Sequence, residues 1–299
     1  MKRFYKKGIS LFLILLMSFP LCACKSDDSK ALTTVKLNEV AHSIFYAPMY
    51  VAIEKGYFED EGIELSLTTG FGADKTMAAV VSGDADVGFM GTEASIYAYT
   101  EGAKDHVINF AQLTQRAGNF VVARENTDSF SYEDMIGKDV LGGRAGGTPE
   151  MVYEYVLREN GVSPSEVKID QSIDFGSTAA AFSGGQGDYT IEFEPSATAL
   201  EQSGDGYVVA SIGVDSGYLP YTAFCAKESY LKENADLIQH FTNALQKGMD
   251  YVAGHSPEEI ATVIAPQFSE TDLKTLTLIV SRYYDQETWN TDLILREEG

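Results

Sequence analysis

A short glycine-rich segment, GGRAGG at residues 142–147, leads directly into a predicted helix, TPEMVYEYVLRENG. The guanidinium of Arg144 could hold a carboxylate, sulfonate or phosphate through a forked pair of hydrogen bonds. Gly146, Gly147 and Thr148 would present backbone amides and a hydroxyl at the start of the helix, where anions bind. The segment lacks the Gly-Lys-Ser/Thr ending of a nucleotide-binding P-loop. It therefore predicts binding of a small polar ligand; the alternative is that Arg144 points to solvent and the glycines only form the turn.

Acidic side chains occupy the other polar positions of interest. In TIEFEP, the alternation of a strand puts Glu192 and Glu194 on one face. Two carboxylates there could act as an acid–base pair, or could equally hold amino or ring N–H groups of a ligand. Thr92 and Glu93 come where another helix begins, so the amides there could bind an anion, whereas the carboxylate of Glu93 favours a donor-rich or cationic ligand. The alternative is that Glu93 is simply a favourable charge at a helix N-terminus. Asp174 is also expected to face the site. The negative charge of the whole site would then repel sulfonate or nitrate.

Aromatic residues accompany these polar groups. In AHSIFYAP, His42, Phe45 and Tyr46 could offer a polar edge and flat faces to a ring; the alternative is that Phe45 packs in the core and His42 is a satisfied surface histidine. Phe71 lies between two glycines and could form a stacking wall or be an exposed loop residue. Tyr221 could cover a bound ligand. Together they predict a site for a planar molecule.

The sequence contains few of the residues that catalysis or metal binding would need. Of three cysteines, Cys22 and Cys24 lie near the N-terminus and Cys225 is the one left in the body of the chain. No disulfide and no cysteine metal site is expected. The four histidines fall in no metal-binding spacing and in no Ser-His-Asp set. We therefore predict a protein without cofactor or metal that is not an enzyme.

These residues are placed by a pattern in which strands alternate with helices. Alternating or buried apolar runs predict strands, and Pro48 and Pro149 near helix starts, with Gly56 and Gly161 at helix ends, predict helices. Such a pattern is typical of open α/β sheets, whose ligands bind beyond the carboxyl ends of the strands. The predicted strands include 33–41, 63–69, 85–91, 167–173 and 187–195, and the predicted helices include 47–58, 73–83, 148–161 and 178–185.

The order of elements occurs twice. Residues 82–95 and 183–198 both run from Ser-Gly through an aspartate and a strand into a glutamate-containing loop, which predicts two lobes of like topology. Each lobe would be an open, mostly parallel sheet flanked by helices. Residues 119–130 and 221–233 are predicted to cross between the lobes as paired hinge strands. Lobe one would comprise residues 33–122 and 222–299, and lobe two residues 123–221.

The N-terminus has the pattern of an export signal. Basic residues precede an apolar run at 9–19 that is too short to span a bilayer, and LCAC at 21–24 fits a bacterial lipobox. We predict a signal peptide at 1–23, lipidation of Cys24 and a tether at 24–32. The alternative is an ordinary cleaved signal with Cys24 as an incidental thiol. The protein would be extracytoplasmic and anchored to the bacterial cell membrane.

The chain is strongly acidic. Removal of residues 1–23 takes away four basic and no acidic residues, so the formal charge of −22 becomes −26. Such a charge argues against nucleic acid and against docking on anionic lipid. No later segment has the length of a membrane span, so the chain is not expected to be a permease.

Three segments in this order, HSIFYAPMYVAIEKGYFEDEGIELSL, SGDADVG and GGRAGGTPEMVYEYVLRENGV, resemble the solute-binding proteins of bacterial import ATPases. Within these, the chain is similar to the NMT1-like group, which serves aliphatic sulfonates, taurine, nitrate and pyrimidine precursors of thiamine. The resemblance implies a periplasmic-binding-protein type 2 fold with the ligand between two lobes. It also implies a further helix beyond LREEG, where this chain ends.

The resemblance implies a monomeric protein that closes over a small molecule and delivers it to an ABC permease and its ATPase. Aromatic and carboxylate groups favour a nitrogen heterocycle, such as a thiamine-precursor pyrimidine. A sulfonate-, taurine- or nitrate-type anion is the alternative ligand, and ligand sensing with a membrane receptor is the alternative role. An enzyme of the same fold is disfavoured, because the pyrimidine-synthesising relative of eukaryotes depends on a cysteine-rich motif that this chain lacks.

Overall fold

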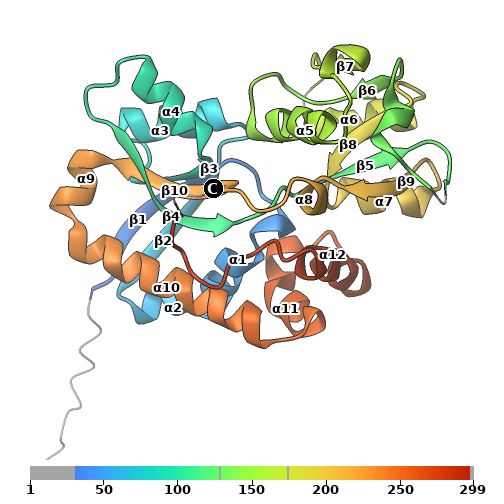
Figure 1. Cartoon of the computed structure of the whole chain (residues 1–299). Helices are drawn as coiled ribbons and strands as arrows, with labels where there is room; N and C mark the ends of the chain where they lie inside the picture. The colour runs from blue at the N-terminus through green and yellow to red at the C-terminus, as the bar shows by residue number, and fades with distance from the viewer. Residues whose placement is uncertain (1–30, 128, 174, 297–299) are drawn as a thin grey trace, which may run out of the picture. The chain divides into compact units, whose positions relative to one another are not determined.

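The computed structural model describes residues 31–127, 129–173 and 175–296 of the chain. The predicted signal peptide, Cys24 and Asp174 lie outside the described residues. The described part contains two five-stranded sheets flanked by helices (Figure 1). This confirms the predicted fold class.

The first sheet has the strand order β2-β1-β3-β10-β4. β1 pairs in parallel with β2 and β3, whereas β10 runs antiparallel to both β3 and β4. Figure 1 shows helices on both faces of this sheet, α3 and α4 on one and α1, α2 and α10 on the other. The strands are β1 Thr33–Glu39, β2 Ile63–Thr69, β3 Val87–Gly91, β4 Val107–Thr114 and β10 Thr222–Lys227, and the helices are α1 Ala47–Glu54, α2 Tyr57–Asp60, α3 Ala73–Ser82, α4 Glu93–Thr100 and α10 Ala235–Gly254.

The second sheet has the same arrangement, β7-β6-β8-β5-β9. β6 pairs in parallel with β7 and β8, and β5 runs antiparallel to β8 and β9. In each sheet one antiparallel strand comes from the segment that links the two halves of the chain. The strands are β5 Asn119–Ala123, β6 Asp139–Leu141, β7 Lys168–Asp170, β8 Tyr189–Phe193 and β9 Tyr207–Ser211, and the helices are α5 Thr148–Glu159, α6 Phe175–Ser183, α7 Ser196–Ser203 and α8 Ile212–Asp215.

The two crossing segments differ in detail from the expected paired hinge strands. β5 and β10 enter the middles of different sheets rather than pairing with each other. All five residues of β5 are buried, so their backbone groups need partners on both sides, which a central strand position supplies. The predicted boundary between residues 122 and 123 therefore falls inside β5, and the chain passes between the sheets at residues 115–118 and 212–221.

Further helices follow β10: α9 Glu228–Glu233, α11 Pro257–Ile264 and α12 Leu273–Asp285. Asp272 caps α12 by accepting hydrogen bonds from the backbone of Lys274 and Thr275. Leu276, Ile279, Val280 and Tyr283 recur at helical spacing and are buried. The remaining turns are 3-10 helices η1 Ile44–Tyr46, η2 Tyr132–Met135, η3 Pro164–Glu166 and η4 Ala265–Phe268.

The segment after α12 lies along β4. Gln112 and Gln115 donate backbone hydrogen bonds to the carbonyls of Leu293 and Thr288. The indole of Trp289 is 9% exposed and donates to the carbonyl oxygen of Phe45 over 2.8 Å. This segment therefore closes the edge of the first sheet and supports the loop after β1.

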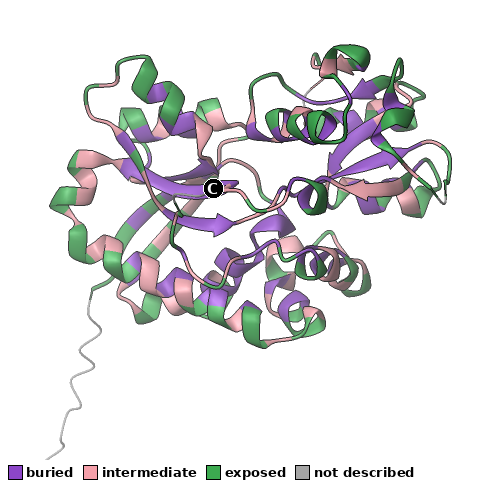
Figure 2. Ribbon diagram, in the orientation of Figure 1, coloured by how far each residue is buried: buried purple, intermediate pink, exposed green. Residues whose placement is uncertain are grey.

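The strands and the inner faces of the helices form the core (Figure 2). In β1 the buried positions are Val35, Leu37 and Glu39, as the alternation of a strand requires. Cys225 is a buried free cysteine in β10. No helix in the described part of the chain is long and apolar enough to cross a membrane.

Candidate functional site

A cavity of about 680 Å³ lies where residues that follow strands of both sheets meet. Ligands of open α/β sheets bind in this position, beyond the carboxyl ends of the strands. Of the residues predicted from sequence, Thr92 and Gly146 do not line it, and Asp174 lies outside the described residues. The predicted residues that line it are His42, Tyr46, Phe71, Glu93, Arg144, Gly147, Thr148, Glu192, Glu194 and Tyr221. Ligand contact by each of them stays a prediction.

The glycine loop and the start of α5 bind groups from the first half of the chain. The hydroxyl of Thr148 donates to one carboxylate oxygen of Glu93, and the amide of Thr148 donates to the other over 3.3 Å. Glu93 thus occupies the anion-binding position at the N-terminus of α5. Arg144 forms an ion pair of 3.0 Å with Asp74. Both interactions join the second half of the chain to the first.

Tyr97 adds a hydrogen bond at the rim of the same region. Its hydroxyl donates to the carbonyl oxygen of Gly146 over 3.0 Å. Gly146 has a φ of 74°, a conformation in which glycine is strongly favoured. The predicted residues of this loop are therefore engaged within the protein, and Gly146 faces α4 rather than the cavity.

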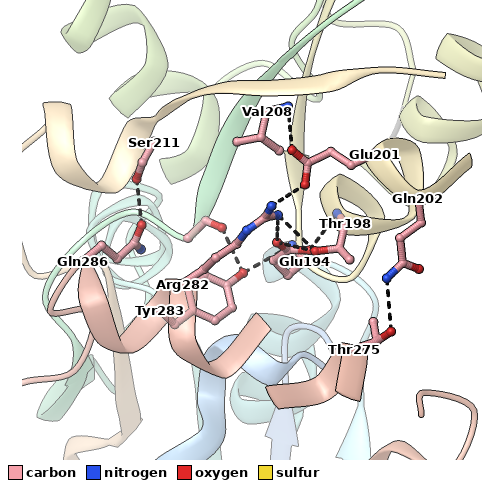
Figure 3. A network of polar contacts seen from close by, with 11 residues as sticks. Glu194, Thr198, Glu201, Gln202, Val208, Ser211, Thr275, Arg282, Tyr283 and Gln286 are labelled. Carbon is pink, nitrogen blue, oxygen red and sulfur yellow. Dashed lines mark hydrogen bonds and ion pairs between the residues drawn. The ribbon is translucent and has the colours of Figure 1, made fainter. Parts of the chain in front are cut away.

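Glu194 is a buried carboxylate with a full set of partners. One oxygen accepts from Arg282 over 2.7 Å and from the Thr198 hydroxyl over 2.9 Å, and the other accepts from the backbone amide of Thr198 over 2.9 Å. Arg282 also pairs with Glu201 (Figure 3). Since Arg282 comes from α12, this network ties the C-terminal helix to the end of β8.

Glu192 lies two residues earlier on β8 and has no such counter-ion among the described residues. It is 1% exposed, and the Thr190 hydroxyl donates to it over 2.6 Å. Burial raises the pKa of Glu192 to about 7, while hydrogen bonds from Thr190 and Thr178 act in the opposite direction. The cavity wall therefore contains one carboxyl group whose charge the protein leaves uncompensated.

Aromatic rings form much of the remaining wall. Phe45 packs edge-on against Tyr221, with ring centroids 5.6 Å apart at an interplanar angle of 89°. The hydroxyl of Tyr221 is buried without a hydrogen-bond partner in the described structure, and burial raises its pKa. Phe71 is 76% exposed and has a φ of 56°, so its backbone is held in the left-handed region at the mouth of the cavity.

His42 lies at the edge of the cavity with both ring nitrogens occupied. Nδ1 is 2.9 Å from a carboxylate oxygen of the buried Glu39, and Nε2 donates to the carbonyl oxygen of Gln267 over 2.9 Å. The hydrogen bond with Glu39 raises the pKa of His42. Tyr50 also donates to Glu39 over 2.6 Å. Both ring nitrogens of His42 thus have partners within the protein, and contact between His42 and a ligand stays a prediction.

Sequence reasoning missed two aromatic residues of the wall, Phe175 and Phe193. Phe45, Phe175 and Phe193 line the cavity, and Phe193 packs against both of the others. Phe45, for which both a ligand contact and a core position were considered, is buried and also lines the cavity. Phe175 could have been found from its position, because it begins a helix after a strand, as Tyr46 does.

A second cavity, of about 480 Å³, lies around the turn before β8. Arg124 lines it and donates to the carbonyl oxygens of Phe182, Gln186 and Gly187 at 2.6–2.7 Å. This arginine is therefore used to hold the turn, and we place the functional site in the larger cavity. Within the described residues, no group of three or more His, Cys, Asp or Glu side chains could hold a metal ion.

Comparisons with known proteins give matches over most of the chain. The family model described as NMT1/THI5 like matches residues 44–260. YtlA of Bacillus subtilis (strain 168) is 44% identical over 299 residues, which cover 100% of this chain and 89% of YtlA. The riboflavin-binding protein RibY of Chloroflexus aurantiacus is 27% identical over 244 residues, which cover 79% of this chain and 66% of RibY.

Solved structures share the fold. The periplasmic aliphatic sulphonate binding protein SsuA from Escherichia coli gives a TM-score of 0.71 at 17% identity, covering 89% of this chain and 87% of SsuA. The periplasmic nitrate-binding protein NrtA from Synechocystis PCC 6803 gives a TM-score of 0.66 at 17% identity, covering 82% of this chain and 69% of NrtA. At this identity the likeness establishes a shared two-lobed α/β architecture and leaves the ligand open.

Proposed function

Since the chain belongs to the NMT1/THI5-like family, we propose that it is an extracytoplasmic solute-binding protein of an ABC import system. The observation that carries this proposal is the cavity of about 680 Å³ lined by residues of both halves of the chain. A ligand that contacts both halves stabilises the arrangement in which they lie together, which is how hinge closure captures a solute. The division into two lobes is part of this proposal, with its boundaries moved from residues 122/123 and 221/222 to the crossing segments 115–118 and 212–221.

The proposed partners are a membrane permease and its cytoplasmic ATPase. Lipidation of Cys24 would hold the protein at the membrane, and a monomer would present the closed form to the permease. These features follow from the predicted lipobox and from the family. The strongly acidic chain fits a partner whose exposed surface is neutral or basic.

The favoured ligand is a nitrogen heterocycle, such as a thiamine-precursor pyrimidine. Three observations support it: aromatic rings line the cavity, Glu192 offers a carboxyl group, and the Tyr221 hydroxyl has no partner among the described residues. Rings of this kind gain from stacking, and their N–H groups satisfy buried carboxyl oxygens. RibY, a relative, is named for binding riboflavin, which also contains a nitrogen heterocycle.

The alternative ligand is an anion, since structural neighbours are named for binding sulfonate and nitrate. The residues around the cavity disfavour it. Arg144 is paired with Asp74, and Glu93 holds the helix N-terminus that an anion would need. An anion would therefore have to displace carboxylates of the protein.

Native mass spectrometry of the protein purified from its source, followed by thermal-shift measurements, tests the proposal. A co-purifying heterocycle, or an aminopyrimidine that raises Tm by several degrees, supports it. Binding of taurine or an alkanesulfonate without binding of pyrimidines overturns the ligand class. A folded protein that binds no compound of either class overturns the role in solute capture.

A further inference from the structure

Glu192 is the one carboxyl group of the cavity wall with only hydroxyl partners in the described structure. It is 1% exposed, its contacts are with Thr190 and Thr178, and it lines the cavity. The other carboxylates at the cavity have cationic, amide or hydroxyl partners that come from distant elements: Glu93 binds the start of α5, Glu194 binds Arg282 and Asp74 binds Arg144.

No charged group on the neighbouring elements compensates Glu192. Of the elements packed against β8, β5 and α6 carry no charged side chain. β6 carries Asp139, which pairs with Lys168, and α7 carries Glu201, which pairs with Arg282. None of these described groups forms a hydrogen bond or ion pair with Glu192. Arg144 and Lys75 also line the cavity, but Arg144 pairs with Asp74 and neither side chain forms a hydrogen bond or ion pair with Glu192. Within the described structure, Glu192 therefore has no cationic partner.

A buried carboxylate without a counter-ion is unfavourable, and it either takes up a proton or acquires a cationic partner. The raised pKa of Glu192, about 7, is the sign of this conflict in the free protein. A nitrogen that carries positive charge and N–H groups resolves it, because a charge-assisted hydrogen bond in a shielded site is stronger than one between neutral groups. Such a ligand would also release the proton that Glu192 holds.

We propose that Glu192 determines specificity, by selecting ligands that place a cationic or amino-bearing nitrogen against its buried carboxyl group. This inference rests on the proposed solute-binding function and names the chemistry of its ligand. The aromatic residues that line the cavity would then select a planar ring in the ligand, and Glu192 would select a cationic or amino-bearing nitrogen on that ring. Glu194, which directly follows β8, is not part of this selection, because Arg282 and Thr198 already use both of its oxygens.

Isothermal titration calorimetry with two probes tests the inference. 4-Aminopyrimidine carries the amino group, and pyrimidine has the same ring without it. The protein should bind 4-aminopyrimidine about tenfold or more tightly than pyrimidine, and Glu192→Gln should abolish this preference, since a hydrogen bond to a charged group contributes roughly 1.5–3 kcal/mol. Glu201→Gln is the matched control, because Glu201 also lies beside β8 but does not line the cavity. Glu201→Gln should keep the preference of the unaltered protein for 4-aminopyrimidine over pyrimidine.

Proton exchange gives a second measurement. Titrations at pH 7 in phosphate and in Tris should yield different apparent binding enthalpies for 4-aminopyrimidine, and this difference should vanish in Glu192→Gln. An unchanged preference and unchanged proton exchange in Glu192→Gln overturn the inference and leave the solute-binding function standing. If ethanesulfonate binds and neither pyrimidine does, this inference fails together with the ligand class. If no probe of either class binds, the solute-binding function itself fails.

Discussion

Glu192 lies on β8 and Glu194 directly follows the end of this strand, and both are almost completely buried at the edge of the same cavity. Glu194 receives an arginine, a hydroxyl and a backbone amide, whereas Glu192 receives only hydroxyl groups. The difference comes from α12, which reaches Glu194 and does not reach Glu192. Two residues that the alternation in TIEFEP treats alike thus have different surroundings: one carboxylate joins two parts of the fold, and the other is the carboxyl group that we propose meets the ligand.

Removal of Arg282 should cause the largest change in the free energy of unfolding. Arg282→Ala leaves the buried Glu194 and the adjacent Glu201 without their counter-ion, and loss of one partner of a buried ion pair costs about 3–5 kcal/mol. We expect the free energy of unfolding, measured by urea denaturation at pH 7, to fall by about 3 kcal/mol, because Arg282 is partly exposed. A loss below about 1 kcal/mol would contradict the interpretation that Arg282 compensates the buried charge of Glu194.

Glu192→Gln should instead increase the free energy of unfolding, and the size of this increase should depend on pH. The pKa of Glu192 is about 7 in the folded protein against an ordinary 4.5, so the folded state binds more protons between these values and loses stability as pH rises through them. At pH 8 this loss is about 3 kcal/mol. The side-chain amide of the introduced glutamine has one N–H without a hydrogen-bond partner, which lowers stability by about 1 kcal/mol. The variant should therefore be about 2 kcal/mol more stable than the unaltered protein at pH 8.

The control for that measurement is the same pair of proteins below pH 4.5, where both states hold the proton. The advantage of Glu192→Gln should disappear there. An advantage that is equal at both pH values would assign the effect to packing rather than to the charge of Glu192.

Thr148→Val tests a third carboxylate, Glu93, whose partner crosses the cleft. The substitution removes the hydroxyl that donates to Glu93 and keeps the backbone amide contact. We expect a loss of about 1 kcal/mol in the free energy of unfolding, the usual size for one hydrogen bond. Thr178→Val, within the second half alone, serves for comparison: it should lower stability similarly, while Thr148→Val alone should alter the approach of the two halves, as measured by small-angle scattering.

The smallest effect is expected for Arg144→Ala. Arg144 and Asp74 are about half exposed, and exposed pairs of this kind contribute less than about 1 kcal/mol. Stability by thermal denaturation should be nearly unchanged. A more than tenfold loss of ligand affinity in this variant would restore the hypothesis that Arg144 clamps an anionic group of the ligand.

Much of the architecture could be predicted from the sequence. Pro48 and Pro149 lie in the first turns of α1 and α5, and the repeated order of elements matches the repeated order of strands in the two sheets. The loops after the strands likewise lie around one cavity. These features depend on local pattern and on the rules of α/β topology, which one sequence contains.

The partners of the charged groups could not be predicted. Arg282 follows Glu194 by 88 residues, and only the packing of α12 brings them together. Glu93 and Thr148, 55 residues apart, were each expected to bind a ligand, and they bind each other. The alternation in TIEFEP placed both carboxylates on one face, but a strand pattern says nothing about which of them receives a counter-ion. These choices are made by long-range packing.

Trp289 gives the protein an internal reporter. It is the sole tryptophan of the chain, its indole is almost buried, and it is hydrogen-bonded to the backbone of Phe45, whose ring lines the cavity. Light absorbed at the red edge of the aromatic band excites this residue and not the tyrosines. Emission therefore comes from one site, directly behind a residue of the cavity wall. A shift in the wavelength or intensity of that emission would follow occupancy of the cavity without any label, and on the timescale of binding itself.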